Sequence, residues 1–324
     1  MQFLAFVSLF LTQGQTETDR IVYPGALEKA PKVVLIAGDE EYRSEEALPQ
    51  LAKILNRNFG LKTVVLFPID PKNGQINPNV NNNIPGTDEL RDANLMIIGL
   101  RFRNLPDKQM KEIVDYVDSG RPIIALRTST HAFNMSPDSK YASWTWNSNG
   151  PLKGGFGKQI LGETWVSHHG NHGSESTLGI FATGKESSPI LKGIKTGEIW
   201  GPTDVYEAHP PKDAEILVLG QVLAGMTKDS KPVAGKKNTP MMPIVWTREV
   251  KSASGEVAKV LTTTMGSSTD LENEAFRRLL VNGVHWALGK DVPENAKVDI
   301  VGEYKPTKFS FNGFVKGKKP SDYR

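Results

Sequence analysis

Four short apolar runs, each long enough for one strand, constrain the fold of this sequence more than any other feature. They lie at residues 33–38, 63–67, 94–100 and 122–126. Continuous apolar runs of this length are typical of strands that are covered on both faces. Amphipathic helix patterns follow the first run, at 47–55, and the third run, at 106–117. Strands that alternate with helices in this way predict an α/β fold with a doubly wound parallel sheet.

A fifth strand is expected at residues 257–264, followed by a helix that ends at Gly289. Ser44 is the expected cap of the first helix, and Thr269 with Glu272 forms an expected capping box for the last one. The region 133–211 is rich in Gly, Trp and His and carries only short strand signals. We interpret this middle region as an elaboration folded over the sheet edge.

Three parts are expected along the chain: a signal peptide with linker at 1–20, an α/β domain at 21–290 and a C-terminal extension at 291–324. The apolar run at 1–11 is too short to span a bilayer but suits the core of a signal peptide. A buried N-terminal strand is the alternative. We therefore expect a secreted or periplasmic protein, and no other segment has the length and apolarity of a membrane span.

Composition excludes several classes of function. The chain has 39 basic and 36 acidic residues, so it lacks the concentrated positive charge typical of nucleic-acid binding. It has no cysteine, which excludes disulfides, thiolate metal sites and thiol catalysis. No Gly-rich phosphate loop follows a strand, so no nucleotide cofactor is expected. The turn around Ser129 lacks the glycines of a nucleophile elbow, which disfavours a serine hydrolase. A homo-oligomer is left open.

Polar clusters follow three of the expected strands. They are residues 39–43, 101–104 and 127–131. The carboxyl ends of parallel strands meet at one edge of a sheet, where ligands bind in this class of fold. We therefore expect these clusters to face one another and to form a binding site.

Three histidines lie within five residues of the middle region, at His168, His169 and His172. Imidazoles at such spacing could hold a divalent metal ion, with Asp39 or Glu41 across the site. In the other interpretation one histidine is a general base and the others are structural. Trp165 precedes this cluster, and an aromatic face there could stack on a sugar ring.

Several of these segments also resemble a known family when taken in order. They are residues 38–42, 124–133, His168-His169, 200–206, 262–266, 277–282 and 286–287. Together they resemble the ThuA-like (trehalose-utilisation) family over about residues 32–290. The resemblance implies a flavodoxin-like sheet of the class I glutamine amidotransferase-like type, and a role in bacterial carbohydrate catabolism, often through 3-keto-sugars. Arg127 and Ser267 stand where family members commonly have histidines.

The resulting hypothesis is an exported carbohydrate-active enzyme, a lyase, hydrolase or isomerase, that acts on a 3-keto-glycoside or related sugar. A non-catalytic sugar-binding protein is the alternative. The expected catalytic residues are Asp39, Glu41, His131, His168 and His169, and the expected metal ligands are His168 and His172. The expected substrate-binding residues are Tyr42, Arg43, Arg101, Arg103, Arg127, Thr128, Trp165 and Asp204. Arginines there would stabilise an oxyanion or enediolate.

Overall fold

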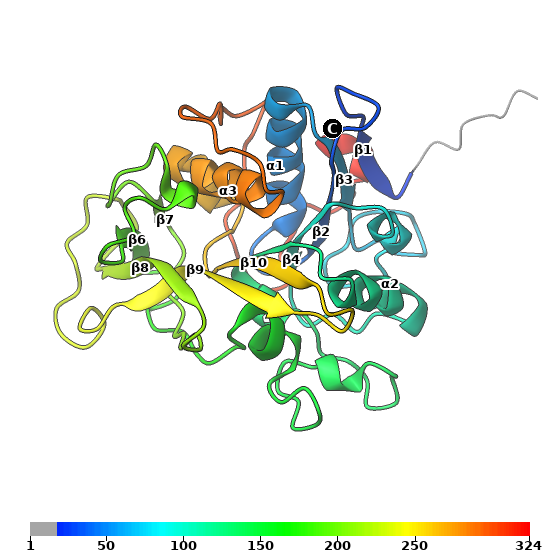
Figure 1. The fold of residues 1–324 in the computed structure, drawn as a ribbon, viewed down its shortest axis with the longest axis horizontal. Coiled ribbons are helices and arrows are strands. Elements are labelled where there is room, and N and C mark those ends of the chain that lie inside the picture. The colour runs from blue at the N-terminus through cyan, green and yellow to red at the C-terminus, as the bar shows by residue number, and fades with distance from the viewer. Residues whose placement is uncertain (1–17) are drawn as a thin grey trace, which may run out of the picture.

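The computed structural model describes residues 18–324 as one ten-stranded mixed sheet with helices on both of its faces (Figure 1). The strand order is β1-β3-β2-β4-β5-β10-β9-β8-β6-β7. The parallel centre consists of β3 (Lys62–Leu66), β2 (Lys32–Gly38), β4 (Leu95–Leu100), β5 (Ile123–Leu126) and β10 (Val257–Thr263). The five predicted strands are thus present and parallel.

The helices pack on this centre according to the two-residue period of its strands. In β2, Val33 and Leu35 belong to the core beneath α1 (Ser44–Phe59) and α3 (Glu274–Ala287). Their neighbours Val34 and Ile36 belong to the opposite core, beneath α2 (Asp107–Asp118). Both faces of the strand are therefore buried, as the continuous apolar run predicts.

Antiparallel strands extend the sheet at both ends. β1 (Arg20–Tyr23) pairs with β3, and β9 (Met242–Lys251) pairs with β10. Beyond β9 lie β8 (Glu215–Leu223), β6 (Ser176–Phe181) and β7 (Trp200–Gly201). The middle region therefore joins the sheet itself, with β6 and β7 at its edge. The expectation that 133–211 would fold over the edge missed this continuity. The long strands β8 and β9, which follow that region, were not expected.

The beginnings of two helices differ from expectation. Ser44 is the first residue of α1 and not its cap, because its hydroxyl accepts hydrogen bonds from the backbone of Gly38 and Asp39, each at 3.0 Å. The proposed capping box at Thr269 and Glu272 is a separate 3₁₀ turn. Helix α3 is instead capped by Asn273, whose side chain accepts from the backbone of Phe276 at 2.8 Å.

The C-terminal extension (residues 291–324) packs against the helices and ends beside β1 (Figure 1). Arg277 of α3 donates to the carbonyl of Val298 at 2.6 Å, and Tyr304 donates to the carbonyl of Ser268, also at 2.6 Å. The predicted signal peptide falls mainly on residues 1–17, which lie outside the described residues. Within residues 18–324, none of the helices combines the length and apolarity required to cross a membrane.

Candidate functional site

The carboxyl ends of β2, β4 and β5 meet, because the strands are parallel and in register. Gly38 at the end of β2 pairs with Leu100 at the end of β4. Beyond these ends, the Thr128 hydroxyl donates to Asp39, and Arg101 forms an ion pair with Glu40. The three polar clusters therefore lie together, as their positions after parallel strands predicted.

Backbone strain is concentrated at the same place. Among the described residues, four non-glycine residues have left-handed backbone: Arg43, Phe102, Arg127 and Asn312, with φ of 60°, 49°, 44° and 52°. Three of them belong to the loops after β2, β4 and β5, and Asn312 lies in the C-terminal extension. A left-handed conformation is rare for bulky residues, and such strain tends to gather at functional sites. The residue pattern gave no signal for this feature.

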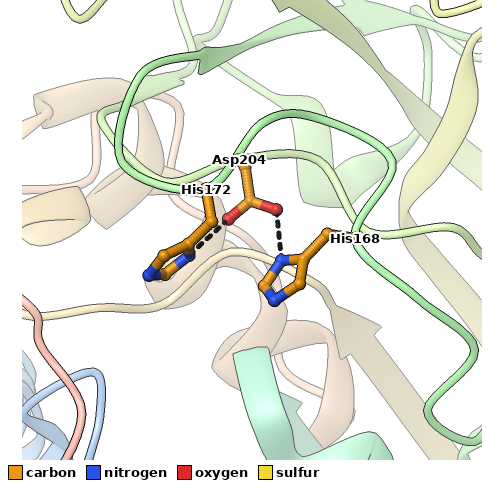
Figure 2. A group of neighbouring side chains, drawn as sticks. All are labelled: His168, His172 and Asp204. Atoms are coloured by element: carbon orange, nitrogen blue, oxygen red, sulfur yellow. Dashed lines mark hydrogen bonds and ion pairs between the residues drawn. The ribbon is translucent and has the colours of Figure 1, made fainter.

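Asp204 lies between two histidines from the middle region (Figure 2). Its carboxylate oxygens contact Nδ1 of His168 at 2.7 Å and Nδ1 of His172 at 3.3 Å. Burial would raise the pKa of Asp204, but Arg127 and the two histidines hold this pKa well below its usual value. The carboxylate therefore stays charged and fixes both rings, while both Nε2 atoms point away from it (Figure 2).

Arg127 supports this carboxylate from the other side. One of its Nη atoms donates to the carbonyls of Asp204 and Thr264, both at 2.7 Å. The other donates to Oδ1 of Asp204 at 2.8 Å and to the Tyr42 hydroxyl at 2.9 Å. The guanidinium also lies 4.3 Å from the Tyr42 ring and 3.8 Å from the Tyr206 ring. Arg127, expected to bind substrate, is thus buried, with both Nη atoms bound to protein groups.

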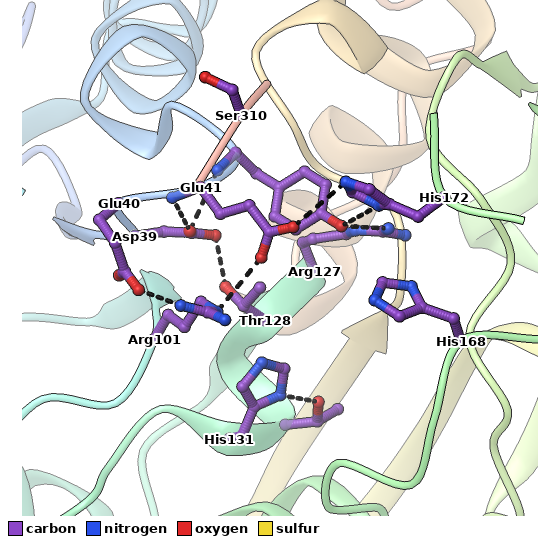
Figure 3. Close-up of polar contacts among 12 residues, drawn as sticks. Asp39, Glu40, Glu41, Arg101, Arg127, Thr128, His131, His168, His172 and Ser310 are labelled. Carbon is purple, nitrogen blue, oxygen red and sulfur yellow. Dashed lines mark hydrogen bonds and ion pairs between the residues drawn. The ribbon is translucent and has the colours of Figure 1, made fainter. Parts of the chain in front are cut away.

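Glu41 faces His172 across the site (Figure 3). Its Oε1 lies 3.5 Å from Nε2 of His172, and its Oε2 lies 3.3 Å from Nε of Arg101. Among residues 18–324, neither Oε1 of Glu41 nor Nε of Arg101 has a hydrogen-bond partner. Burial and the neighbouring Asp39 raise the pKa of Glu41. The raised pKa favours the protonated form of Glu41. Its carboxyl group lies beside the Nε donor of Arg101.

His131 lies below this group, at the end of the turn after β5 (Figure 3). Its Nδ1 contacts the Thr130 hydroxyl at 3.1 Å, and its ring packs 4.9 Å from Phe102 and 5.0 Å from Trp165. Burial, together with the charges of Arg101 and Arg127, lowers its pKa well below the usual value. His131 is therefore neutral near pH 7, the form that accepts a proton.

Four of the expected site residues stabilise the surrounding loops instead. Asp39 accepts from the backbone of Glu41 and Tyr42 at 2.8 and 3.1 Å, besides the hydroxyl of Thr128. Arg103 is buried and binds the carbonyls of Pro78 and Val80 in the long loop before β4. Arg43 binds the C-terminal extension, and His169 turns away to the carbonyl of Lys237 at 2.9 Å. The sequence pattern placed these side chains near the site but could not show their direction.

A cation could be held by the histidine group. The described residues contain one set of three suitable ligands, His168, His172 and Asp204, whose ligand atoms lie within 4.8 Å of one another. Asp204 already pairs with the Nδ1 atoms, which is how second-shell carboxylates orient metal-binding imidazoles. The Nε2 atom of His172 lies 3.5 Å from Oε1 of Glu41, and imidazole nitrogens and carboxylate oxygens are ligands that zinc prefers.

The tail supplies aromatic residues that the sequence did not predict as part of the site. Phe309 lies 5.0 Å from the ring of His172, and Phe311 lies 5.6 Å from it. Tyr206 was also missed as a site residue, although Trp165 lies 4.7 Å from it. Trp165 itself also contacts the ring of His168, at 4.9 Å.

Comparison with known proteins agrees with this architecture. The chain is similar to a putative ThuA-like protein from Parabacteroides merdae, with 16% identity, a TM-score of 0.52, and coverage of 88% of this chain and 99% of that one. It is also similar to a putative ThuA-like protein from Bacteroides uniformis, with 18% identity, a TM-score of 0.50, and coverage of 83% and 96%. No curated protein matches the sequence. The family model described as "ThuA: Trehalose utilisation" matches residues 32–287, so the chain belongs to the ThuA family.

Proposed function

We propose that this protein is a carbohydrate-active enzyme that uses acid/base or metal-assisted chemistry on a 3-keto-glycoside or related sugar. The observation that carries the proposal is the group around Asp204. One buried, charged carboxylate orients two imidazoles, and a neutral histidine and a glutamate of raised pKa lie beside them. Perturbed titratable groups that gather at one place are typical of catalytic sites. The sugar class rests on the family and on the aromatic rings at the site.

The residues divide into a proton acceptor, a proton donor and an anion stabiliser. His131 or His168 could accept a proton from the carbon next to a ketone, since an imidazole works as a base in its neutral form. Glu41 could return a proton to the leaving oxygen because its raised pKa favours the protonated form. Arg101 would stabilise the developing oxyanion with its guanidinium, whose Nε has no hydrogen-bond partner within residues 18–324.

A divalent metal ion fits the same residues. His168 and His172 would bind it through Nε2, with Glu41 as a further ligand, while Asp204 fixes the imidazoles. Such an ion would polarise a carbonyl oxygen of the substrate. Glutamine hydrolysis by a thiol is excluded because the chain has no cysteine. Ser129 is no substitute nucleophile, since its hydroxyl donates to the carbonyl of Ile98 at 3.0 Å.

Three finer expectations belong to the same proposal. The order β3-β2-β4-β5-β10 is the 2-1-3-4-5 order of flavodoxin-like folds, which supports a doubly wound core of that type. We also propose 21–290 as the α/β domain and 291–324 as its extension. Export would rest on the apolar run at residues 1–11, and cell fractionation tests it.

Turnover of 3-keto-glucosides by the purified protein, with and without chelator and after metal analysis, tests the function. We expect His131→Ala, His168→Ala and His172→Ala to lose activity. His209→Ala is the matched control, because the His209 side chain is 60% exposed and its imidazole pairs with Glu207 at the surface. If the wild type binds sugar but turns over no substrate, the protein is a sugar-binding protein and the enzyme proposal is wrong. If the chelator has no effect, the acid/base route is retained and the metal is rejected.

A further inference from the structure

The C-terminal extension lies outside the residues that match the family model, yet it reaches the candidate site. The match ends at residue 287, whereas Phe309, Ser310 and Phe311 contact residues of the loop after β2 and of the middle region. Family membership therefore says nothing about what this part of the site does. Its role has to be inferred from its own contacts.

Buried charged side chains hold the extension in place. Arg43 is 3% exposed and donates to the Ser310 hydroxyl at 2.8 Å and to the Thr307 hydroxyl at 3.1 Å. Glu46 accepts from the backbone and the hydroxyl of Thr307, both at 2.6 Å. The backbone of Ser310 donates to the carbonyl of Glu41 at 3.0 Å. The segment is thus attached directly to the loop that carries a candidate catalytic residue.

The turn that follows is also tightly seated. Phe309 is buried and lies 5.3 Å from the ring of Tyr42. Asn312 adopts left-handed backbone, and a Cβ at Gly313 would lie 2.4 Å from an Nη atom of Arg43. These constraints hold the backbone on both sides of Phe311.

Phe311 differs from the other exposed apolar side chains of the molecule. Four large hydrophobic side chains are exposed among residues 18–324, and Phe311, at 55%, is the aromatic one. Its ring lies 5.6 Å from His172 and 5.5 Å from the guanidinium of Arg101. Beside these residues lie the two unpaired polar atoms, Oε1 of Glu41 and Nε of Arg101. An exposed aromatic side chain thus adjoins polar atoms that have no hydrogen-bond partner within residues 18–324.

We propose that Phe311 is a specificity-determining residue that stacks on the apolar face of a ring sugar. The hydroxyl or carbonyl oxygens of the same sugar then meet Arg101, Glu41 and His172. The inference rests on the proposed function and deepens it, because it names a cyclic sugar as the ligand and assigns its binding platform to the C-terminal extension. An open-chain polyol offers the same hydroxyls but no flat face.

The test compares Phe311→Ala and Phe311→Trp with the wild type in binding and turnover. Isothermal titration would use trehalose, a methyl glucoside and its 3-keto derivative, with sorbitol as the open-chain probe. Val257→Ala is the matched control, because Val257 is 53% exposed and begins β10, at the opposite end of the parallel strands. We expect Phe311→Ala to weaken ring-sugar binding and raise KM about tenfold, or about 1.4 kcal/mol, with kcat kept. Phe311→Trp should retain binding.

Each outcome has a distinct meaning. If the wild type binds ring sugars and Phe311→Ala binds them equally well, the platform is wrong while the proposed function stands. If Phe311→Ala lowers kcat without changing KM, Phe311 supports the catalytic groups and the platform is again wrong. If the wild type binds none of the ring sugars, both the proposed function and the platform are rejected. Circular dichroism of each variant separates these results from a failure to fold.

Discussion

Replacement of Asp204 by asparagine tests the central ion pair of the site. The carboxylate is fully buried and lies 2.8 Å from an Nη atom of Arg127, which is 1% exposed. At an effective dielectric constant of about 20, two charges at this distance attract by about 6 kcal/mol. Asp204→Asn keeps the side-chain volume but leaves the guanidinium buried without its counter-charge. We expect a loss of about 3–5 kcal/mol in the free energy of unfolding.

Urea unfolding at pH 7 measures this loss, with Asp213→Asn as the control. Asp213 pairs with Arg248 at 2.8 Å, but its side chain is 54% exposed, so its removal should cost less than about 1 kcal/mol. The double variant Arg127→Met/Asp204→Asn should recover part of the loss, since no uncompensated charge remains. If Asp204→Asn and Asp213→Asn unfold at the same urea concentration, the buried pair of Asp204 and Arg127 does not stabilise the protein as expected.

The stability difference between the wild type and Asp204→Asn should depend on pH. Because the folded protein holds the pKa of Asp204 below its unfolded value, this carboxylate adds stability above the unfolded pKa, about 4. That contribution is lost as the pH falls towards the folded pKa. The difference in unfolding free energy between wild type and Asp204→Asn should therefore shrink below about pH 4. Activity should fall about 10–100-fold at pH 7, because the imidazoles lose their orienting partner.

Three further predictions concern supporting residues. Glu45 is buried, and neither of its carboxylate oxygens has a hydrogen-bond partner within residues 18–324. Burial raises its pKa to about 8 from 4.5, so the wild type should lose stability as the pH rises from about 4.5 to 8. In urea unfolding, the free energy of unfolding of Glu45→Gln relative to wild type should rise by more than about 1.4 kcal/mol between about pH 4.5 and 8. A difference that stays constant with pH would contradict this prediction. Arg43→Met should free the extension, seen as faster hydrogen exchange at residues 307–313 and a raised KM; unchanged exchange would refute it. Ser129→Ala should keep its activity, and its free energy of unfolding, measured by thermal unfolding, should fall by about 1 kcal/mol. Loss of activity would instead indicate that Ser129 is a nucleophile.

Much of the fold follows from local patterns. The runs at 33–38, 94–100 and 122–126 became β2, β4 and β5 because a strand buried on both faces needs an unbroken apolar sequence. The antiparallel strand β9 was missed because no such continuous apolar run extends over its length. In β9 buried residues occupy only the centre and the last four alternate between half-buried and exposed, so its apolar run is short. Its length is set by pairing with β10 and β8, which a local pattern does not contain.

The candidate site was predictable in position but not in direction. Parallel topology places the loops after β2, β4 and β5 at one edge, and this argument placed Glu41, Arg101 and His131 there. It could not separate them from Asp39 and Arg103, whose side chains turn into the loops. That choice depends on contacts with segments distant in sequence, such as the carbonyl of Pro78 for Arg103.

The absence of cysteine has a structural counterpart in the turn after β5. Arg127 occupies this turn with a left-handed backbone of φ 44°. Its guanidinium donates hydrogen bonds to Asp204, Thr264 and Tyr42. The parallel core therefore supplies a fixed positive charge here, whereas the imidazoles it helps to orient come from the middle region. If this division holds, substitutions in the middle region and in the C-terminal extension should change substrate choice. Substitution of Arg127 in the turn after β5 should change stability and kcat together.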